Sequence, residues 1–211
     1  MPRAAGMHLK KKSKMEQKIL MGVAHRDEEE LALVVDKMRE YNPRVIGLEL
    51  PENYAKRELF KVSSFFFSDL AKIARDENRE VIPLESPELF DYIKSVLIAK
   101  GVVQKQINRK ELEAKVAEYK YQLKDCHYKP PQIIYRPYLR LTIFQKAIDI
   151  LNQEQSLEDV LTLWDDNNRR REEYVKKNID KNQPDLVIIG DGHAKKLREV
   201  LPYYKYLTTI V

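Results

Sequence analysis

Short nonpolar runs alternate with amphipathic helical segments in the first part of the chain, and this alternation limits the fold more than any other feature. Each run is rich in aliphatic residues and too short for a typical helix, as expected of a buried strand. Strands that alternate with helices of this length predict right-handed crossovers and a mostly parallel sheet. The predicted strands are 18–25, 44–50 and 80–85, and the predicted helices run from the capping residue Asp27 to the Asn42-Pro43 stop and over 58–77.

The segment 86–182 has no convincing strand and predicts several helices instead. Ser86 followed by Pro87 is typical of a helix start, and Gly101 is typical of a helix end. Three prolines predict a loop over 126–137, since proline interrupts backbone hydrogen bonding. The other predicted helices cover 108–125, 138–153 and, from a capping box formed by Ser156 and Asp159, a stretch that ends near 180.

After Pro184 the sheet pattern resumes, with a predicted strand over 185–193, a short helix over 194–201 and a last strand over 206–211. We therefore expect one α/β domain over 18–211. It should contain a mostly parallel sheet flanked by helices, with a helical insertion (86–182) between the third and fourth strands. Such insertions usually lie above the carboxyl edge of the sheet, where they form a wall or a lid.

Two of the predicted strands end in the same Gly-x-x-His sequence, Gly22 to His25 and Gly190 to His193. With six glycines and four histidines in 211 residues, about 0.1 such sequences are expected by chance. Parallel strands present their carboxyl ends at one edge, where ligands bind, so both imidazoles are expected there. We expect Gly22, Gly190 and Gly192 to let the backbone turn sharply and approach a ligand.

Carboxylates occupy the ends of the same predicted strands. Glu49 lies within a nonpolar run, Glu85 ends the third strand, and Asp191 follows the fourth. A buried carboxylate is costly unless it is paired or coordinated. Together with His25 and His193, these residues could form the ligand set of a divalent ion, whose bound water would be a hydrolytic nucleophile. Glu49 or Glu85 could act as a general base instead.

Simpler interpretations stay open for most of these residues. A histidine at a strand end is often a hydrogen-bonded core residue, and Glu85 and Asp191 could be exposed caps or turn residues. The run 167–173 is typical of a solvated charged face, although one of its arginines could point down at the sheet edge and bind a carboxylate or phosphate.

The net charge of +5 belongs to the start of the chain. Residues 1–18 hold six basic residues and one acidic residue, whereas the remainder holds 32 of each. We therefore expect a basic disordered leader over 1–17 and no secretory signal, with Met1, Met7 or Met15 as the true start. The less favoured alternative is that this leader contacts nucleic acid or a membrane by its charge, since the rest of the chain is neutral. The single cysteine excludes an internal disulfide and fits a cytoplasmic protein without membrane spans.

These motifs together resemble the TraB/GumN/TIKI superfamily, which includes ChaN-like and erythromycin-esterase-like proteins. Its pattern is a first strand that ends in G-x-x-H, a glutamate near the end of the second strand, an arginine-bearing helix and a later strand that ends in G-x-x-H. The corresponding segments here are Gly22 to His25, Glu49 in IGLELPENY, RREEYVKKNI at 170–179, and Gly190 to His193. The resemblance covers roughly 18–211, in the same order, helical middle section included.

The resemblance implies a metal-dependent hydrolase or peptidase with the two histidines and Glu49 at its centre. Arg171 matches the helix arginine best and Arg170 next, and Arg171 would stabilise negative charge that develops on a small-molecule or peptide substrate. The chain departs from the pattern at Tyr54 and at Glu85-Ser86, where TraB-like members often have an arginine and an Asp-Arg pair. The expected cofactor is Mn, Co or Zn. The alternative is a non-catalytic protein that binds haem or a small anion in the same pocket, and the oligomeric state stays open, a homo-oligomer included.

Overall fold

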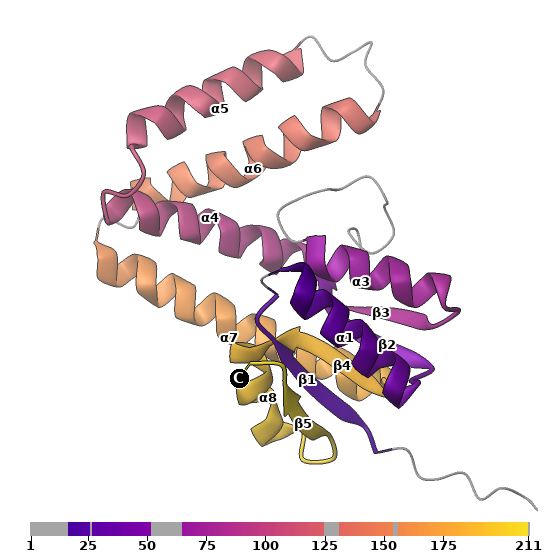
Figure 1. Cartoon of the computed structure of the whole chain (residues 1–211). Helices are drawn as coiled ribbons and strands as arrows, with labels where there is room; N and C mark the ends of the chain where they lie inside the picture. The colour runs from indigo at the N-terminus through magenta and orange to yellow at the C-terminus, as the bar shows by residue number, and fades with distance from the viewer. Residues whose placement is uncertain (1–16, 26, 52–64, 125–130, 154–155, 211) are drawn as a thin grey trace, which may run out of the picture.

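The structure, a computed structural model, describes residues 17–25, 27–51, 65–124, 131–153 and 156–210 (Figure 1). Within them the chain forms a five-stranded, all-parallel sheet with helices on both faces, which confirms the predicted α/β class. The predicted leader and the first part of the helix predicted over 58–77 lie outside these residues. The elements are β1 (Ile19–Val23), α1 (Glu28–Tyr41), β2 (Val45–Pro51), α3 (Phe65–Asp76), β3 (Glu80–Glu85), α4 (Pro87–Val103), α5 (Arg109–Lys124), α6 (Pro131–Gln153), α7 (Leu157–Asn182), β4 (Leu186–Gly190), α8 (Asp191–Val200) and β5 (Lys205–Thr208).

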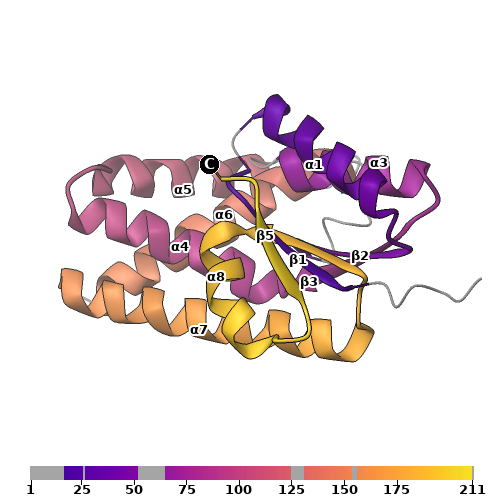
Figure 2. The same cartoon turned by 60° about the horizontal axis from the view of Figure 1, so that its bottom comes forward.

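The strand order is β3-β2-β4-β1-β5, so β4 lies between the first two strands of the chain. The connection after β1 passes through α1 toward one edge of the sheet, whereas the connection after β4 passes through α8 toward the other edge. Figure 2 shows α1 and α3 on one face of the sheet and α7 and α8 on the other. The carboxyl ends of β1 and β4 are therefore the point at which the topology reverses direction, where parallel sheets bind ligands.

Local capping signals define the helix starts as the sequence predicts. Asp27 accepts a hydrogen bond from the backbone N–H of Glu30, and Ser86 accepts one from Leu89. Ser156 and Asp159 form the complete capping box at the start of α7. Each of these bonds satisfies a backbone N–H that has no partner inside the helix, which is worth about 1 kcal/mol.

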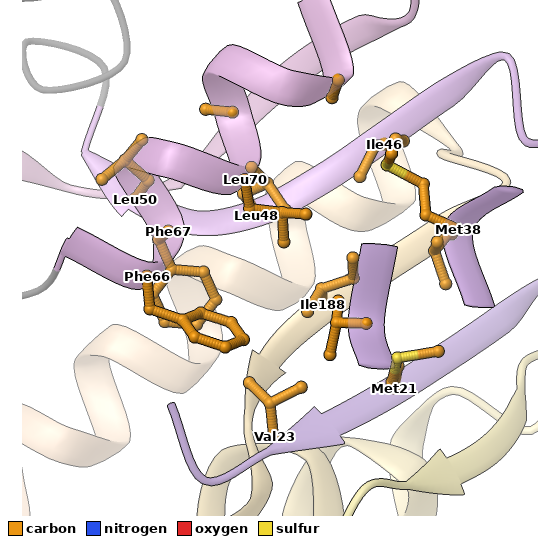
Figure 3. Close-up of a cluster of buried hydrophobic side chains, with 14 of the residues drawn as sticks. Met21, Val23, Met38, Ile46, Leu48, Leu50, Phe66, Phe67, Leu70 and Ile188 are labelled. Carbon is orange, nitrogen blue, oxygen red and sulfur yellow. The ribbon is translucent and has the colours of Figure 1, made fainter. Parts of the chain in front are cut away.

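Side-chain alternation along the strands produces two hydrophobic cores, one on each face of the sheet. The first lies under α1 and α3 and includes Met21, Leu48 and Ile188 (Figure 3). The second lies under α7 and α8 and includes Leu20, Val187 and Ile189. Since neighbouring residues of a strand point to opposite faces, Glu49 lies on the α7 side, opposite the neighbouring Leu48.

The helical insertion is present between β3 and β4 as predicted, and it has a core of its own. Helices α4, α5, α6 and α7 contribute to that core, with Val96, Leu112, Ala147 and Val160 among its buried residues. Figure 1 shows α5 and α6 lying beyond α4, on the side away from the sheet. None of the helices in the described ranges combines the length and the nonpolar character that a membrane span requires.

Several local predictions differ from the structure, and β1 and β5 end earlier than predicted, at Val23 and Thr208. Helix α4 continues past Gly101 to Val103, because the absence of a side chain at Gly101 leaves space for Ile107. Helix α6 begins at Pro131, so part of the loop predicted over 126–137 is helical. Pro131 loses no intrahelical hydrogen bond in the first turn, whereas Pro137 stands inside the helix. Strand β4 ends at Gly190, and Asp191 to His193 form the first turn of α8.

The predicted role of the glycines in sharp turns is also wrong. No described glycine has a positive φ, and the left-handed residue near the first motif is His25 itself, with φ 46°. The lack of room for a side chain explains why the two strand positions, Gly22 and Gly190, hold glycine. A Cβ at Gly22 would lie 2.6 Å from Asp191 Oδ1 and 3.1 Å from the Cα of the same residue, and a Cβ at Gly190 would lie 3.1 Å from Glu49 Oε2.

Gly22→Ala should therefore destabilise the fold by about 1–3 kcal/mol, because the new methyl group overlaps backbone and side-chain atoms of α8. Gly192→Ala is the matched control, since a Cβ there meets nothing within 4 Å and alanine favours the first turn of α8 by about 0.5–1 kcal/mol. Urea unfolding of the two variants measures both effects. Equal stabilities would contradict the steric explanation.

Candidate functional site

A buried arginine on α7 joins the carboxyl ends of β2 and β3. Arg171 donates to both oxygens of Glu85, with Nη2 2.6 Å from Oε1 and Nε 3.2 Å from Oε2. The same Nη2 lies 3.2 Å from Oε1 of Glu49. Arg171 and Glu85 are 7% and 3% exposed. Because the two oxygens of Glu85 match the guanidinium fork, the pair has the geometry of a strong bidentate ion pair.

Burial determines how these groups ionise. Burial raises the pKa of Glu85, against the lowering effect of the adjacent Arg171. Burial also lowers the pKa of Arg171, but Glu85 and then Glu49 raise it by more, so its pKa lies above the usual value. Arg171 is therefore always charged, and its charge is what permits two carboxylates at this end of the sheet.

His193 lies beside the same carboxylates, in the first turn of α8. Its Nε2 is 3.7 Å from Glu49 Oε1, and its Nδ1 is 3.2 Å from Glu172 Oε1. Glu172 also pairs with Lys196 at 2.7 Å. When the imidazole is neutral, the bond to the acceptor Glu172 requires the proton on Nδ1, which leaves Nε2 without a proton.

His25 lies two residues after the end of β1. It is exposed, and its ring centroid lies 5.7 Å from that of Phe67. A Cβ built on Gly190 would lie 3.6 Å from His25 Nε2 and 3.1 Å from Glu49 Oε2. The backbone N–H of Gly190 donates to that same oxygen. The Gly-x-x-His motifs thus bring both histidines into the neighbourhood of Glu49.

Three predicted site residues lie apart from this group. Asp191 accepts hydrogen bonds from Tyr206 and Thr208 and pairs with Lys195, so its carboxylate ties α8 to β5. The side chain of Arg170 is on the exposed face of α7. Gly192 has open space around it.

The space enclosed by the cluster is small. Glu49, Glu85, Arg171, Glu172 and His193 line a cavity of about 10 Å³, together with Val175, Ile189 and Leu197. That volume is about the size of one water molecule. In this conformation the cavity has room for a water or an ion.

The donor types around Glu49 fit a divalent metal ion, since two imidazoles and a carboxylate form a common zinc ligand set. The contact from His193 Nδ1 to Glu172 is also the outer contact usual for a metal-binding histidine. Within the described ranges, however, no group of three His, Cys, Asp or Glu residues is spaced to hold an ion. The chemistry of a metal site is present, but its donors are wider apart than a coordination shell.

Glu172 and Lys196 are members of this cluster that the sequence did not single out. Glu172 is 21 residues from His193 in the chain, and no spacing rule connects α7 with α8. The inward direction of Arg171, by contrast, could be predicted from its spacing along the helix. Arg171 lies four and eight residues before Val175 and Ile179, which face the core.

Comparison of the chain with protein-family models, with curated proteins and with solved structures finds no match. The resemblance to the TraB/GumN/TIKI superfamily therefore stays a prediction that rests on the motifs and their order.

Replacing Arg171 should strongly destabilise the fold. Arg171→Met leaves two carboxylates without their cation, which costs about 3–5 kcal/mol. Arg170→Met, on the exposed face of the same helix, should change the stability by less than about 0.5 kcal/mol. Urea unfolding at pH 8 measures the difference, and similar losses in both variants would contradict a buried ion pair.

The loss in Arg171→Met should be smaller at pH 5 than at pH 8. Burial raises the pKa of Glu85, and Arg171 opposes this increase, so the variant should have a still higher pKa at Glu85. The folded variant then binds a proton more tightly than the unfolded chain, and its stability increases as the pH falls from 8 toward the usual glutamate pKa. A loss of equal size at both pH values would count against this protonation.

Proposed function

We propose that the chain is a hydrolase that acts at the carboxyl edge of its sheet and depends on a divalent metal ion held by His25, His193 and Glu49. The observation that carries the proposal is the position of Glu49 near both histidines. One of its oxygens lies 3.7 Å from His193 Nε2, and a Cβ built on Gly190 would lie 3.1 Å from the other oxygen and 3.6 Å from His25 Nε2. Such an ion would supply a bound water of lowered pKa as the nucleophile.

The charges of the cluster support a cationic partner. Three carboxylates, those of Glu49, Glu85 and Glu172, face two permanent cations, Arg171 and Lys196. With neutral imidazoles this leaves an excess of one negative charge in a partly buried place, where an unbalanced charge is costly. A divalent ion that carries one hydroxide would bring the sum of these charges to zero.

The remaining residues act on the position and protonation of these groups. Arg171 holds Glu49 and Glu85 with the same guanidinium, so in this proposal it orients Glu49 and contributes less to substrate charge than the sequence predicts. Both oxygens of Glu85 are bound to Arg171, which makes Glu85 a positioning residue and not a base. Glu172 keeps the His193 proton on Nδ1, so that Nε2 is available as a ligand or proton acceptor.

The alternative of a haem or anion site in the same place has less support. A cavity of about 10 Å³ has no room for haem. The excess of carboxylates repels a small anion, because Arg171 is already engaged by two of them. The hydrolase proposal uses the polar groups of the cluster without requiring a larger cavity.

Metal binding tests the proposal directly. Protein treated with a chelator and then titrated with Mn²⁺, Co²⁺ or Zn²⁺ should bind about one ion per chain. His25→Ala, His193→Ala and Glu49→Gln should each weaken binding by at least about tenfold, since each removes a ligand. Hydrolysis of a panel of chromogenic esters and peptide amides should require the same ion.

Glu173→Gln is the matched control, because Glu173 is an exposed carboxylate next to the cluster on α7. Its affinity for the ion should equal that of the wild-type protein. Unchanged affinity in the His193→Ala variant, or no bound ion in the wild-type protein, would contradict the proposal.

Glu172→Ala should change the tautomer of His193. Nitrogen-15 NMR of the imidazole at pH 9 should show the proton on Nδ1 in the wild-type protein and a shift toward Nε2 in the variant, since the acceptor is gone. Metal affinity should fall by about 10- to 100-fold, the usual effect of losing such a partner. Glu173→Ala should leave both readings unchanged, and an Nε2–H tautomer in the wild-type protein would contradict the role of Glu172.

A further inference from the structure

The backbone of His25 is left-handed at a place where no helix ends. Five described residues other than glycine have a positive φ, and four of them lie within two residues after the end of a helix: Asn42, Asn78, Lys105 and Gln183. A left-handed residue is an ordinary way for a helix to end. His25, with φ 46°, instead lies between the end of β1 and the start of α1. This conformation is strained for a residue with a side chain, and it persists only where the surrounding structure holds it.

Glu30 holds the chain immediately before His25. Its Oε1 accepts a hydrogen bond of 2.6 Å from the backbone N–H of Ala24 and another of 2.6 Å from the hydroxyl of Thr209. The backbone N–H of Thr209 in turn donates to the carbonyl of Gly22, at 3.0 Å. Since Glu30 lies in the first turn of α1 and Thr209 directly follows β5, one carboxylate ties the end of β1 to two other segments of the chain.

The side chain of His25 packs on Phe67, in the first turn of α3. The two ring centroids lie 5.7 Å apart and the ring planes are inclined by 48°, an arrangement in the range of favourable aromatic pairs. His25 is exposed, whereas Phe67 is 4% exposed and belongs to the core under α1 and α3. Because a close-packed core keeps its side chains in place, the contact with Phe67 restricts the orientations that the imidazole can adopt.

We propose that two positioning residues hold His25 in place before any ligand binds, Glu30 through the backbone and Phe67 through the ring. His25 Nε2 and Glu49 Oε2 both lie within 3.6 Å of the point that a Cβ on Gly190 would occupy. A donor that is fixed near its partner loses less conformational entropy when it binds a ligand. The fixed orientation of His25 stands without the proposed function, whereas its consequence for metal binding rests on that function.

NMR of the metal-free protein tests the role of Phe67. Relaxation of the imidazole C–H groups, assigned with His25→Ala, should show a more mobile ring in Phe67→Leu than in the wild-type protein, since leucine offers no ring to pack on. Phe66→Leu is the matched control. Phe66 is 6% exposed, lies in the same core and contacts Phe67, but no ring contact joins it to His25 in the described part of the chain. Its variant should leave the imidazole as ordered as in the wild-type protein.

Glu30→Ala and Glu30→Gln test the hold on the backbone. Glutamine keeps an oxygen that can accept from Ala24 and Thr209, whereas alanine does not, and both variants lose the same negative charge. Hydrogen exchange of the Ala24 amide should be at least about tenfold faster in Glu30→Ala than in the wild-type protein, and Glu30→Gln should restore most of the protection.

The strain at His25 has a test of its own. Alanine and glycine both remove the imidazole, but only glycine adopts a positive φ without strain. His25→Gly should therefore unfold at a higher urea concentration than His25→Ala. A higher midpoint for His25→Ala would contradict a held, left-handed backbone.

Titration with Zn²⁺ connects the positioning of His25 to the proposed function. Phe67→Leu should weaken Zn²⁺ binding by about tenfold, and Phe66→Leu should bind the ion as the wild-type protein does. Equal ring mobility in the two variants, equal loss of Zn²⁺ affinity in both, or no recovery in Glu30→Gln would each overturn the positioning proposal. An ordered His25 ring in a wild-type protein that binds no ion would retain the positioning proposal and overturn the hydrolase.

Discussion

The ion pair of Arg171 with Glu85 and Glu49 is the interaction on which the geometry of the site depends. It attaches α7 to the carboxyl ends of β2 and β3, and it is buried, so its polar atoms have no alternative partner in water. Removing two carboxylates and a guanidinium from water is costly, and only their mutual contacts offset that cost. Since Glu49 also contacts Gly190 and faces His193, the position of the second motif follows from the same arginine.

Helix α7 connects the two parts of the molecule. Its first half contributes Val160 to the core of the insertion, and its second half contributes Val175 and Ile179 to the core under the sheet. Arg171 and Glu172 lie between these halves, where the insertion meets the carboxyl edge. The insertion is therefore held at the site by a continuous helix with buried residues along its length.

Much of the fold could be predicted because its signals are local. Each signal depends only on residues that are close in the chain. The structure confirms the nonpolar runs as strands β1, β2 and β3, and it confirms the helix caps at Asp27, Ser86 and Ser156. The errors arise where a distant contact changes the meaning of a residue. Gly101 resembles a helix end, but it provides the space that Ile107 occupies. Gly22 resembles a turn residue, but its missing side chain makes room for α8.

The sequence by itself determined the α/β class, the insertion and the delivery of two histidines and Glu49 to one edge, because the succession of strands and helices along the chain and the alternation of side chains follow from the pattern of residues. Only the tertiary structure decided which partners these residues have. The position of each residue around α7 buries Arg171 and exposes Arg170. The packing of α8 against β5 brings Asp191 to Tyr206 and Thr208. The approach of α7 to α8 gives His193 its contact with Glu172. These contacts join residues far apart in the chain, and their geometry exists only after the helices have packed on the sheet.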